Sequence, residues 1–194
     1  MVRYNIGGYI KVIVVLSIAL FLALTFFRNN FSFKNIYNIL GNITTTITIV
    51  TAICILFGSY AWKWSVFQGW LVPFPCLSGK WDGKLISTYN SENKSIPIEV
   101  TIKHKFLNIQ IQVKTNESAS TSICGSFDID EDRGLKQLFY SYQNTPRMTI
   151  RAKSEIHYGT VRLKINEDAT VLEGEYWTTR KTTGDINIRK VIKN

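Results

Sequence analysis

A short alternating segment near the C-terminus has the residue types that bind a phosphorylated aromatic ligand. In residues 172–180 every second side chain shares one face of a predicted strand, and the apolar Leu172 marks that face as interior. The same face carries Gly174, Tyr176, Thr178 and Arg180. A guanidinium donates two parallel hydrogen bonds to phosphate, and a tyrosine ring stacks on a nucleobase with about 1–3 kcal/mol per base. The segment therefore predicts a nucleotide pocket, with a core-packing Tyr176 and a barrel-closing Arg180 as the alternative.

Other candidate residues follow from the same parity argument. Tyr140 and Tyr142 share one face of another predicted strand, and Ser87 shares the face of Trp81. Arg151 follows in a segment that we expect near a barrel mouth. The complete set of predicted ligand-binding residues is Tyr176, Thr178, Arg180, Tyr140, Tyr142, Arg151 and Ser87.

No pattern in the chain predicts catalysis. His104 and His157 stand outside any motif, and the sequence has no phosphate-binding P-loop, nucleophile elbow or metal-ligand spacing. The three cysteines, Cys54, Cys76 and Cys124, form neither a CxxC pair nor a disulfide framework, which fits a reducing compartment. We therefore expect a binding protein rather than an enzyme, with no catalytic residue, no metal and no cofactor.

The candidate residues belong to a predicted β domain over residues 79–194. From Gly79 onward, runs of period two give one buried and one wet face, as in residues 96–102 and 107–113. Turn-like breaks such as residues 143–146 separate these runs. About eight strands at spacings of roughly ten residues predict an antiparallel barrel or sandwich. The opening Gly79-Lys80-Trp81 resembles that of lipocalin-like barrels, in which the tryptophan closes one end.

Two apolar segments precede this domain within residues 1–72. They run from about residue 9 to 27 and from about 43 to 62, and residues 73–78 are a predicted linker. A bilayer core of about 30 Å requires about 20 helical residues, so both segments can span it. The second is rich in threonine, which in a membrane helix bonds backward to its own helix or across to a neighbour. A cleaved signal peptide is the alternative for the first segment, although no small-x-small cleavage site follows Phe27.

The charge is divided unevenly along the chain. Residues 1–78 hold five basic residues and no acidic one, so the net charge of +9 divides into +5 there and +4 in the remainder. A basic balance fits nucleic acid, anionic lipid or a phosphate ligand, and cations that flank membrane segments attract acidic headgroups. More cations flank the pair of segments than lie between them, which favours both termini in the cytoplasm. The flanking residues are Arg3, Lys11, Lys63, Lys80 and Lys84, and those between are Arg28 and Lys34.

These features together resemble one family. Two N-terminal membrane helices, an aromatic exit, GKWDGKL and the later HYGTVRLKI and LEGEYWTTRKTTGDINIRK are similar to the two-transmembrane β-barrel effectors of bacterial CBASS anti-phage systems. The resemblance implies that a cytoplasmic barrel binds a cyclic dinucleotide made by an associated cyclase. Binding would promote oligomerisation of the membrane helices, disruption of the bacterial inner membrane and abortive infection. The implied partners are the second messenger, the lipid bilayer and further copies of the chain, without DNA or RNA.

Two other functions fit the residues themselves. A membrane-tethered, lipocalin-like carrier of an apolar ligand would have a uniformly apolar interior. A structural subunit of a larger membrane complex would need no ligand at all. The composition of the barrel interior separates the carrier from a nucleotide receptor.

Overall fold

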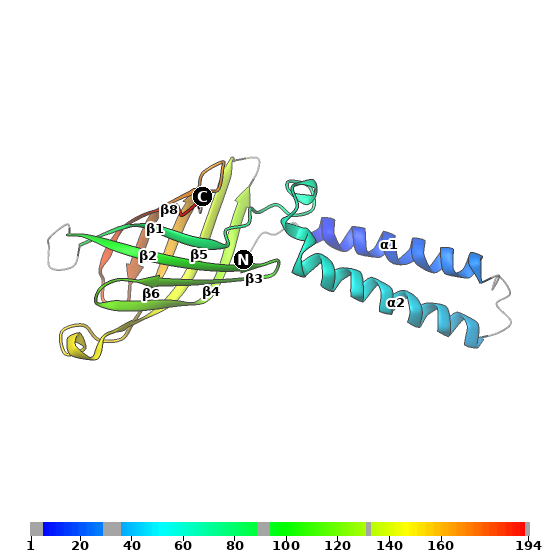
Figure 1. Cartoon of the computed structure of the whole chain (residues 1–194), viewed down its shortest axis with the longest axis horizontal. Helices are drawn as coiled ribbons and strands as arrows, with labels where there is room; N and C mark the ends of the chain where they lie inside the picture. Colours follow the sequence, from blue (N-terminus) through cyan, green and yellow to red (C-terminus); the bar gives the residue numbers. More distant parts are fainter. Residues whose placement is uncertain (1–5, 29–35, 89–93, 131–132, 193–194) are drawn as a thin grey trace. The chain divides into compact units, whose positions relative to one another are not determined.

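The computed structural model describes residues 6–28, 36–88, 94–130 and 133–192. The chain divides into two compact units, Asn5–Pro73 and Phe74–Asn194. The first contains two helices that are long and apolar enough to cross a membrane, and the second is a closed eight-stranded antiparallel barrel (Figure 1). The predicted fold class is confirmed. Of the cations used to predict the orientation, Arg3 and Lys34 lie outside the described residues.

The helical unit consists of α1 (Ile6–Phe27) and α2 (Ile36–Ser59), which contact each other, followed by the short 3-10 turns η1 (Ala61–Lys63) and η2 (Ser65–Phe67). Helix α2 begins well before the predicted start at about residue 43 and ends before residue 62. Its polar residue Asn42 is 1% exposed. The Asn42 side chain accepts a hydrogen bond from Arg28 (3.0 Å) and donates one to Thr25 (3.3 Å). Because these bonds satisfy its polar group, Asn42 is accommodated inside α2.

The threonines of α2 are compatible with a membrane helix because their hydroxyls have backbone partners. Thr44, Thr45, Thr46 and Thr48 each donate to the carbonyl four residues earlier, at 2.8–2.9 Å. This backward bonding satisfies a polar group that lipid cannot solvate.

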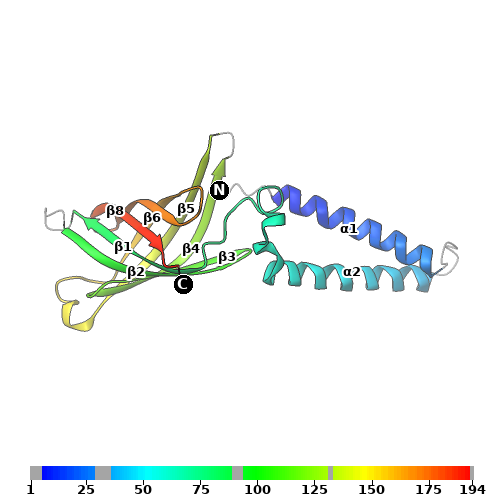
Figure 2. The ribbon, with the colours of Figure 1, turned by 45° about the horizontal axis from the view of Figure 1, so that its top comes forward.

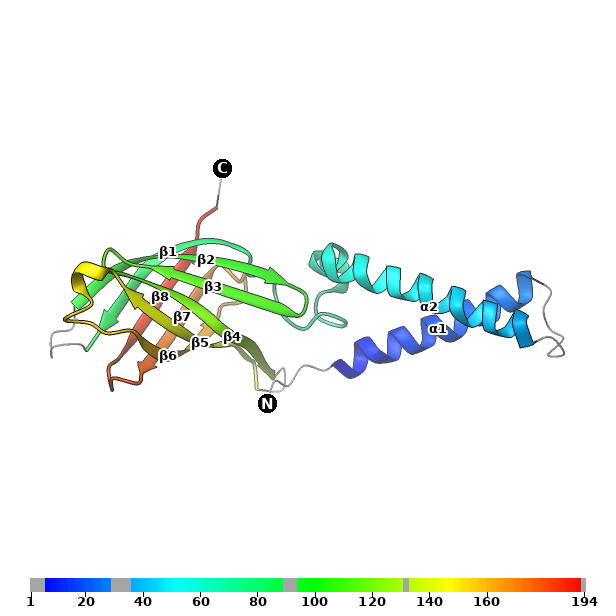
Figure 3. The same ribbon diagram turned by 90° about the horizontal axis from the view of Figure 1, so that it is seen from below.

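The barrel strands follow one another around a ring. Each pairs with the next, and the last pairs with the first (Figure 2). Figure 3 shows β2, β3 and β4 side by side. The strands are β1 (Gly79–Ser87), β2 (Lys94–Lys105), β3 (Asn108–Lys114), β4 (Ser118–Asp130), β5 (Leu135–Pro146), β6 (His157–Ile165), β7 (Val171–Thr178) and β8 (Thr183–Lys190).

The period of two decides which side chains fill the barrel. In β6, His157, Gly159, Val161, Leu163 and Ile165 are buried, whereas most of the side chains between them are exposed. Burial of a large aliphatic side chain contributes about 1.5–3 kcal/mol, so the inward rows are the main source of stability. A one-residue shift would expose every one of them, which fixes the register of the ladder.

One end of the barrel is filled by apolar and aromatic side chains, including part of the predicted linker. Phe74 and Leu77 are buried, and the Phe74 ring stacks on Phe127 with centroids 5.1 Å apart. The Leu77 backbone is tied in twice: its N–H donates to Nδ1 of His104 (3.2 Å), and its carbonyl accepts from Nε1 of Trp81 (3.1 Å). Residues 74–78 therefore belong to the packing of the barrel and are not a free linker.

Candidate ligand-binding cavity

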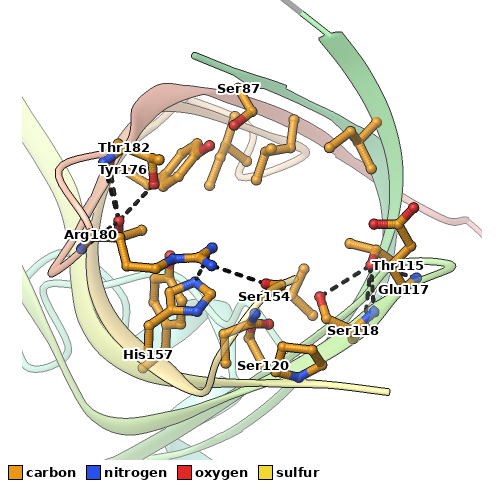
Figure 4. A pocket seen from close by; sticks show the side chains of 18 of the residues that line it. Ser87, Thr115, Glu117, Ser118, Ser120, Ser154, His157, Tyr176, Arg180 and Thr182 are labelled. Carbon is orange, nitrogen blue, oxygen red and sulfur yellow. Dashed lines mark hydrogen bonds between the residues drawn. The ribbon is translucent and has the colours of Figure 1, made fainter. Parts of the chain in front are cut away.

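The other end of the barrel contains a cavity of about 600 Å³ (Figure 4). Its lining comes from the last residues of β1, β3, β5 and β7 and the first residues of β2, β4, β6 and β8, together with the loop after β5. Small-molecule sites typically occupy about 300–1,000 Å³, and the mouths of barrels are common places for them. The volume of this cavity therefore lies within the usual range for small-molecule sites.

Six of the seven predicted ligand-binding residues line this cavity. They are Ser87, Tyr140, Tyr142, Tyr176, Thr178 and Arg180. They come from three parts of the chain that are far apart in sequence, and the closed ring brings them together. Their role in binding remains a prediction.

Arg151 does not line the cavity. It follows the 3-10 turn η4 (Met148–Ile150), and its Nη2 donates to the Pro146 carbonyl at 3.3 Å, which ties the loop to the end of β5. The loop instead contributes Lys153 and Ser154 to the lining. Strand parity does not extend through such a turn, so the sequence pattern gives no basis for choosing between these positions.

Arg180 lies just after the end of β7 and projects into the cavity (Figure 4). Its Nη1 donates to Oγ of Ser154 at 3.0 Å, and its Nη2 donates to Nε2 of His157 at 3.3 Å. The backbone of this turn is held by Thr178, whose hydroxyl accepts from the N–H of Arg180 (3.3 Å) and from that of Thr182 (3.3 Å). Hydrogen bonds to the Arg180 backbone and to its guanidinium nitrogens therefore both fix the direction of this side chain.

His157 is a cavity residue that the motif search missed. Its Nδ1 lies 2.9 Å from the Glu155 carbonyl, which can only accept, and its Nε2 faces a guanidinium, which can only donate. These partners select the neutral tautomer that carries its proton on Nδ1. Burial lowers the pKa of His157, and the nearby charge of Arg180 lowers it further against the hydrogen bond to Glu155. Its position at the inward parity of β6, two residues before Gly159, is the signal that could have identified it.

Three tyrosines give the cavity an aromatic wall. Burial raises the pKa of Tyr140, Tyr142 and Tyr176, so all three hydroxyls stay neutral at physiological pH and can donate hydrogen bonds. The ring centroids of Tyr140 and Tyr142 lie 6.1 Å apart.

Two glycines make room for these rings. A Cβ on Gly159 would lie 2.5 Å from the Tyr142 ring, and one on Gly184 would lie 2.6 Å from that of Tyr176. Each ring therefore rests against a bare backbone of the neighbouring strand.

A hydrogen-bonding wall faces Arg180 across the cavity. It is formed by the turn between β3 and β4 and by the end of β5, and Figure 4 shows its Thr115, Glu117 and Ser118 opposite Arg180. Ser120 donates to Oδ1 of Asn144 at 2.8 Å. Asn144 was missed because residues 143–146 have a turn-like composition, whereas β5 continues through Pro146.

Trp81 lies outside the cavity lining, in the packed end of the barrel. It is fully buried on β1, and the Lys190 ammonium lies 5.7 Å from its ring centroid. A closure role for Trp81 remains a prediction, and this position is consistent with it.

The family described as Cap15, cyclic dinucleotide receptor domain, matches residues 72–190. The match spans all eight strands and every wall of the cavity. The chain belongs to the Cap15 family. Cap15 proteins are effectors of CBASS defence, and the matched domain of this Cap15 chain is a receptor for a cyclic dinucleotide, which is a binding role.

Two curated relatives agree with this assignment. The CD-NTase-associated protein 15 of Staphylococcus schleiferi is 34% identical over 149 residues, which cover 77% of this chain and 79% of the relative. The protein of the same name from Escherichia albertii is 27% identical over 202 residues, which cover 98% of this chain and 95% of the relative. The second alignment covers 98% of this chain and so includes both apolar helices.

Proposed function

We propose that this Cap15 protein binds its cyclic dinucleotide in the cavity of the barrel, and that binding there triggers disruption of the membrane. The observation that carries the proposal is the oriented guanidinium of Arg180, which projects into a cavity that also exposes tyrosine rings. A cyclic dinucleotide combines two phosphates with two aromatic bases. The cavity offers a complementary group for each.

Arg180 is the proposed phosphate ligand. Its hydrogen-bond partners Ser154 and His157 are neutral, so they orient the guanidinium without cancelling its charge. Lys153, which precedes Ser154 in the chain, also lines the cavity and adds a second cation. Hydrogen bonds between guanidinium and phosphate are charge-assisted and stronger than neutral ones, especially away from bulk water.

The tyrosine rings are the proposed base platforms, assisted by hydroxyls. Tyr140, Tyr142 and Tyr176 present aromatic surface, while Ser87 and Thr178 contribute hydroxyl groups to the lining. Such a lining suits a polar, aromatic ligand better than the apolar cargo of a lipocalin-like carrier. It therefore favours the receptor over that alternative, and the proposed role requires no catalytic step.

The proposed output is a change in the membrane unit. Ligand binding promotes association of the α1–α2 hairpins of several copies, which disrupts the inner membrane and aborts the infection. The threonine-rich α2 supports this step, because small and hydroxyl-bearing residues favour close helix packing in lipid. The excess of flanking cations supports a cytoplasmic barrel, where a second messenger is made.

Calorimetry of the full-length chain in lipid nanodiscs against a panel of cyclic dinucleotides tests the binding step. We expect saturable binding of at least one member, and an Arg180→Ala variant should bind it at least about tenfold more weakly, because a charge-assisted hydrogen bond contributes about 1.5–3 kcal/mol. Arg189→Ala is the matched control, since Arg189 is exposed on the outer face of β8. Absence of binding to every member by folded protein, or equal losses in both variants, would refute the site.

Dye release from proteoliposomes tests the membrane step. Addition of the bound ligand should release dye from vesicles that contain the full chain, and Arg180→Ala should shift the required concentration by the same factor as its binding constant. Ligand binding without any release would leave the receptor assignment intact and reject the proposed disruption.

A further inference from the structure

The two walls of the cavity differ in charge. Arg180 lies on one side beside the neutral His157, whereas the turn between β3 and β4 contributes Glu117 on the other (Figure 4). Among the described residues that line the cavity, Glu117 is the one with a carboxylate. Glu117 is exposed. Its carboxylate still repels the phosphates of a doubly anionic ligand in the same cavity, so a group that donates hydrogen bonds suits this position better.

The turn holds Glu117 in a defined position. The Thr115 hydroxyl accepts hydrogen bonds from the N–H of Glu117 (3.1 Å) and from that of Ser118 (2.9 Å). The Glu117 carbonyl accepts from the N–H of Arg147 at 2.9 Å, across the β4–β5 ladder. Since the backbone is held on both sides, only the side-chain torsions of Glu117 remain to be fixed by a ligand.

The chemistry of a carboxylate restricts what it can face. It accepts hydrogen bonds and cannot donate them when ionised. The phosphates are attracted to Arg180 on the opposite wall, so the part of the ligand near Glu117 is a base. Guanine presents two adjacent N–H donors, at N1 and the 2-amino group, which match the two oxygens of one carboxylate. Adenine and cytosine place a ring-nitrogen acceptor beside their amino group, and uracil flanks its one N–H with two carbonyls.

We propose that Glu117 recognises a guanine base and makes the receptor selective for guanine-containing cyclic dinucleotides. This inference rests on the proposed function, because it assigns a base subsite within the same cavity. Arg180 and Glu117 then have separate roles. Arg180 binds a phosphate whatever the base, and Glu117 distinguishes guanine from the other bases.

A comparison of the affinities for cyclic dinucleotides with different bases tests the inference. The full-length chain in nanodiscs is titrated with cyclic di-GMP, cyclic di-AMP and the mixed guanine–adenine dinucleotide. Wild-type protein should bind a guanine-containing ligand at least about tenfold more tightly than cyclic di-AMP, as a good bidentate contact to a base provides. Glu117→Gln should remove most of that preference, because the amide keeps only one acceptor, and should leave or improve cyclic di-AMP binding. Glu173→Gln removes the same charge from an exposed position on β7 and should change nothing.

Three outcomes would overturn the inference. Equal wild-type affinity for cyclic di-AMP and cyclic di-GMP excludes guanine selectivity while leaving the receptor function in place. An equal loss for all ligands in Glu117→Gln, at an unchanged melting temperature, assigns Glu117 a general role instead. Failure of the wild-type chain to bind any cyclic dinucleotide rejects the proposed function itself, and the guanine subsite with it.

Discussion

At the scale of single residues, the cavity depends on a hydrogen bond in which His157 accepts and Arg180 donates. Protonation of His157 at Nε2 would remove the acceptor and place a second cation beside the guanidinium. The lowered pKa of His157 is therefore part of what allows Arg180 to point into the cavity. The residue that orients the proposed phosphate ligand is itself sensitive to pH.

This arrangement predicts how stability changes with pH. Because the pKa of His157 is lower in the folded state than its ordinary value of about 6.5, the unfolded chain binds more protons below that pH. The contribution of neutral His157 is fully present above about pH 6.5 and is lost as the pH falls toward the folded-state pKa. Thermal melting of the full chain between pH 7.5 and 5 should show this loss.

His157→Gln is the matched variant for this measurement. The amide oxygen of glutamine can accept from Arg180 but does not titrate, so the variant should lose less stability over the same pH interval. Parallel pH profiles of the two proteins would show that His157 is not responsible. All other groups are common to both proteins, so their contributions cancel in the difference.

At the scale of elements, the ends of strands mark the limit of what the sequence pattern could predict. Tyr140, Tyr142 and Tyr176 were predicted because the period of two sets their direction within a strand. Lys153 and Ser154 lie in a loop where no period applies, and Arg151 was placed there without such a guide. Asn144 was missed because a proline-terminated segment looks like a turn, although Pro146 ends β5 opposite Ser118. Contacts of loop residues depend on tertiary packing, which cannot be predicted from the alternation of side chains along a strand.

The packed end of the barrel predicts a large cost for one small substitution. Leu77 is fully buried, so Leu77→Ala should reduce the free energy of unfolding by about 2–5 kcal/mol. Leu107→Ala makes the same chemical change at a side chain that is 82% exposed and should cost less than about 0.5 kcal/mol.

Denaturant titration of the full chain in mild detergent measures both costs. A small effect of Leu77→Ala would show that residues 74–78 are a linker after all. Ligand affinity should stay unchanged in the folded Leu77→Ala protein, since the cavity lies at the other end of the barrel.

The helical hairpin shows why the predicted start of its second helix was too late. A hydropathy argument stops where polar residues begin, and Asn42 stands at that point in the sequence. In the structure Asn42 is buried against Thr25 and Arg28, so its polarity is satisfied inside the hairpin. Interhelical hydrogen bonds of this kind typically contribute about 0.6 kcal/mol in membrane proteins. Partners on the other helix cannot be recognised from one segment alone.

At the scale of the whole molecule, the division of charge makes a prediction about topology. If both ends of the hairpin face the cytoplasm, the barrel shares the compartment in which a cyclase works. Cys124 is an exposed reporter on β4, while Cys54 lies in α2 and Cys76 precedes β1. In a Cys54→Ala, Cys76→Ala variant, a membrane-impermeant maleimide should leave Cys124 unlabelled in intact spheroplasts and label it after lysis. Labelling of intact spheroplasts would place the barrel outside and contradict the proposed function.

The pairing of β1 with β8 joins the first strand of the barrel to the last. Contacts between residues so distant in sequence form late, because the entropy of closing a long loop must be offset before they stabilise anything. The cavity is lined from every strand, so a ribosome that stops before β8 releases a chain without a complete receptor. If the cavity binds the messenger as proposed, fragments that lack β8 cannot bind it, and only chains that include β8 can respond to it.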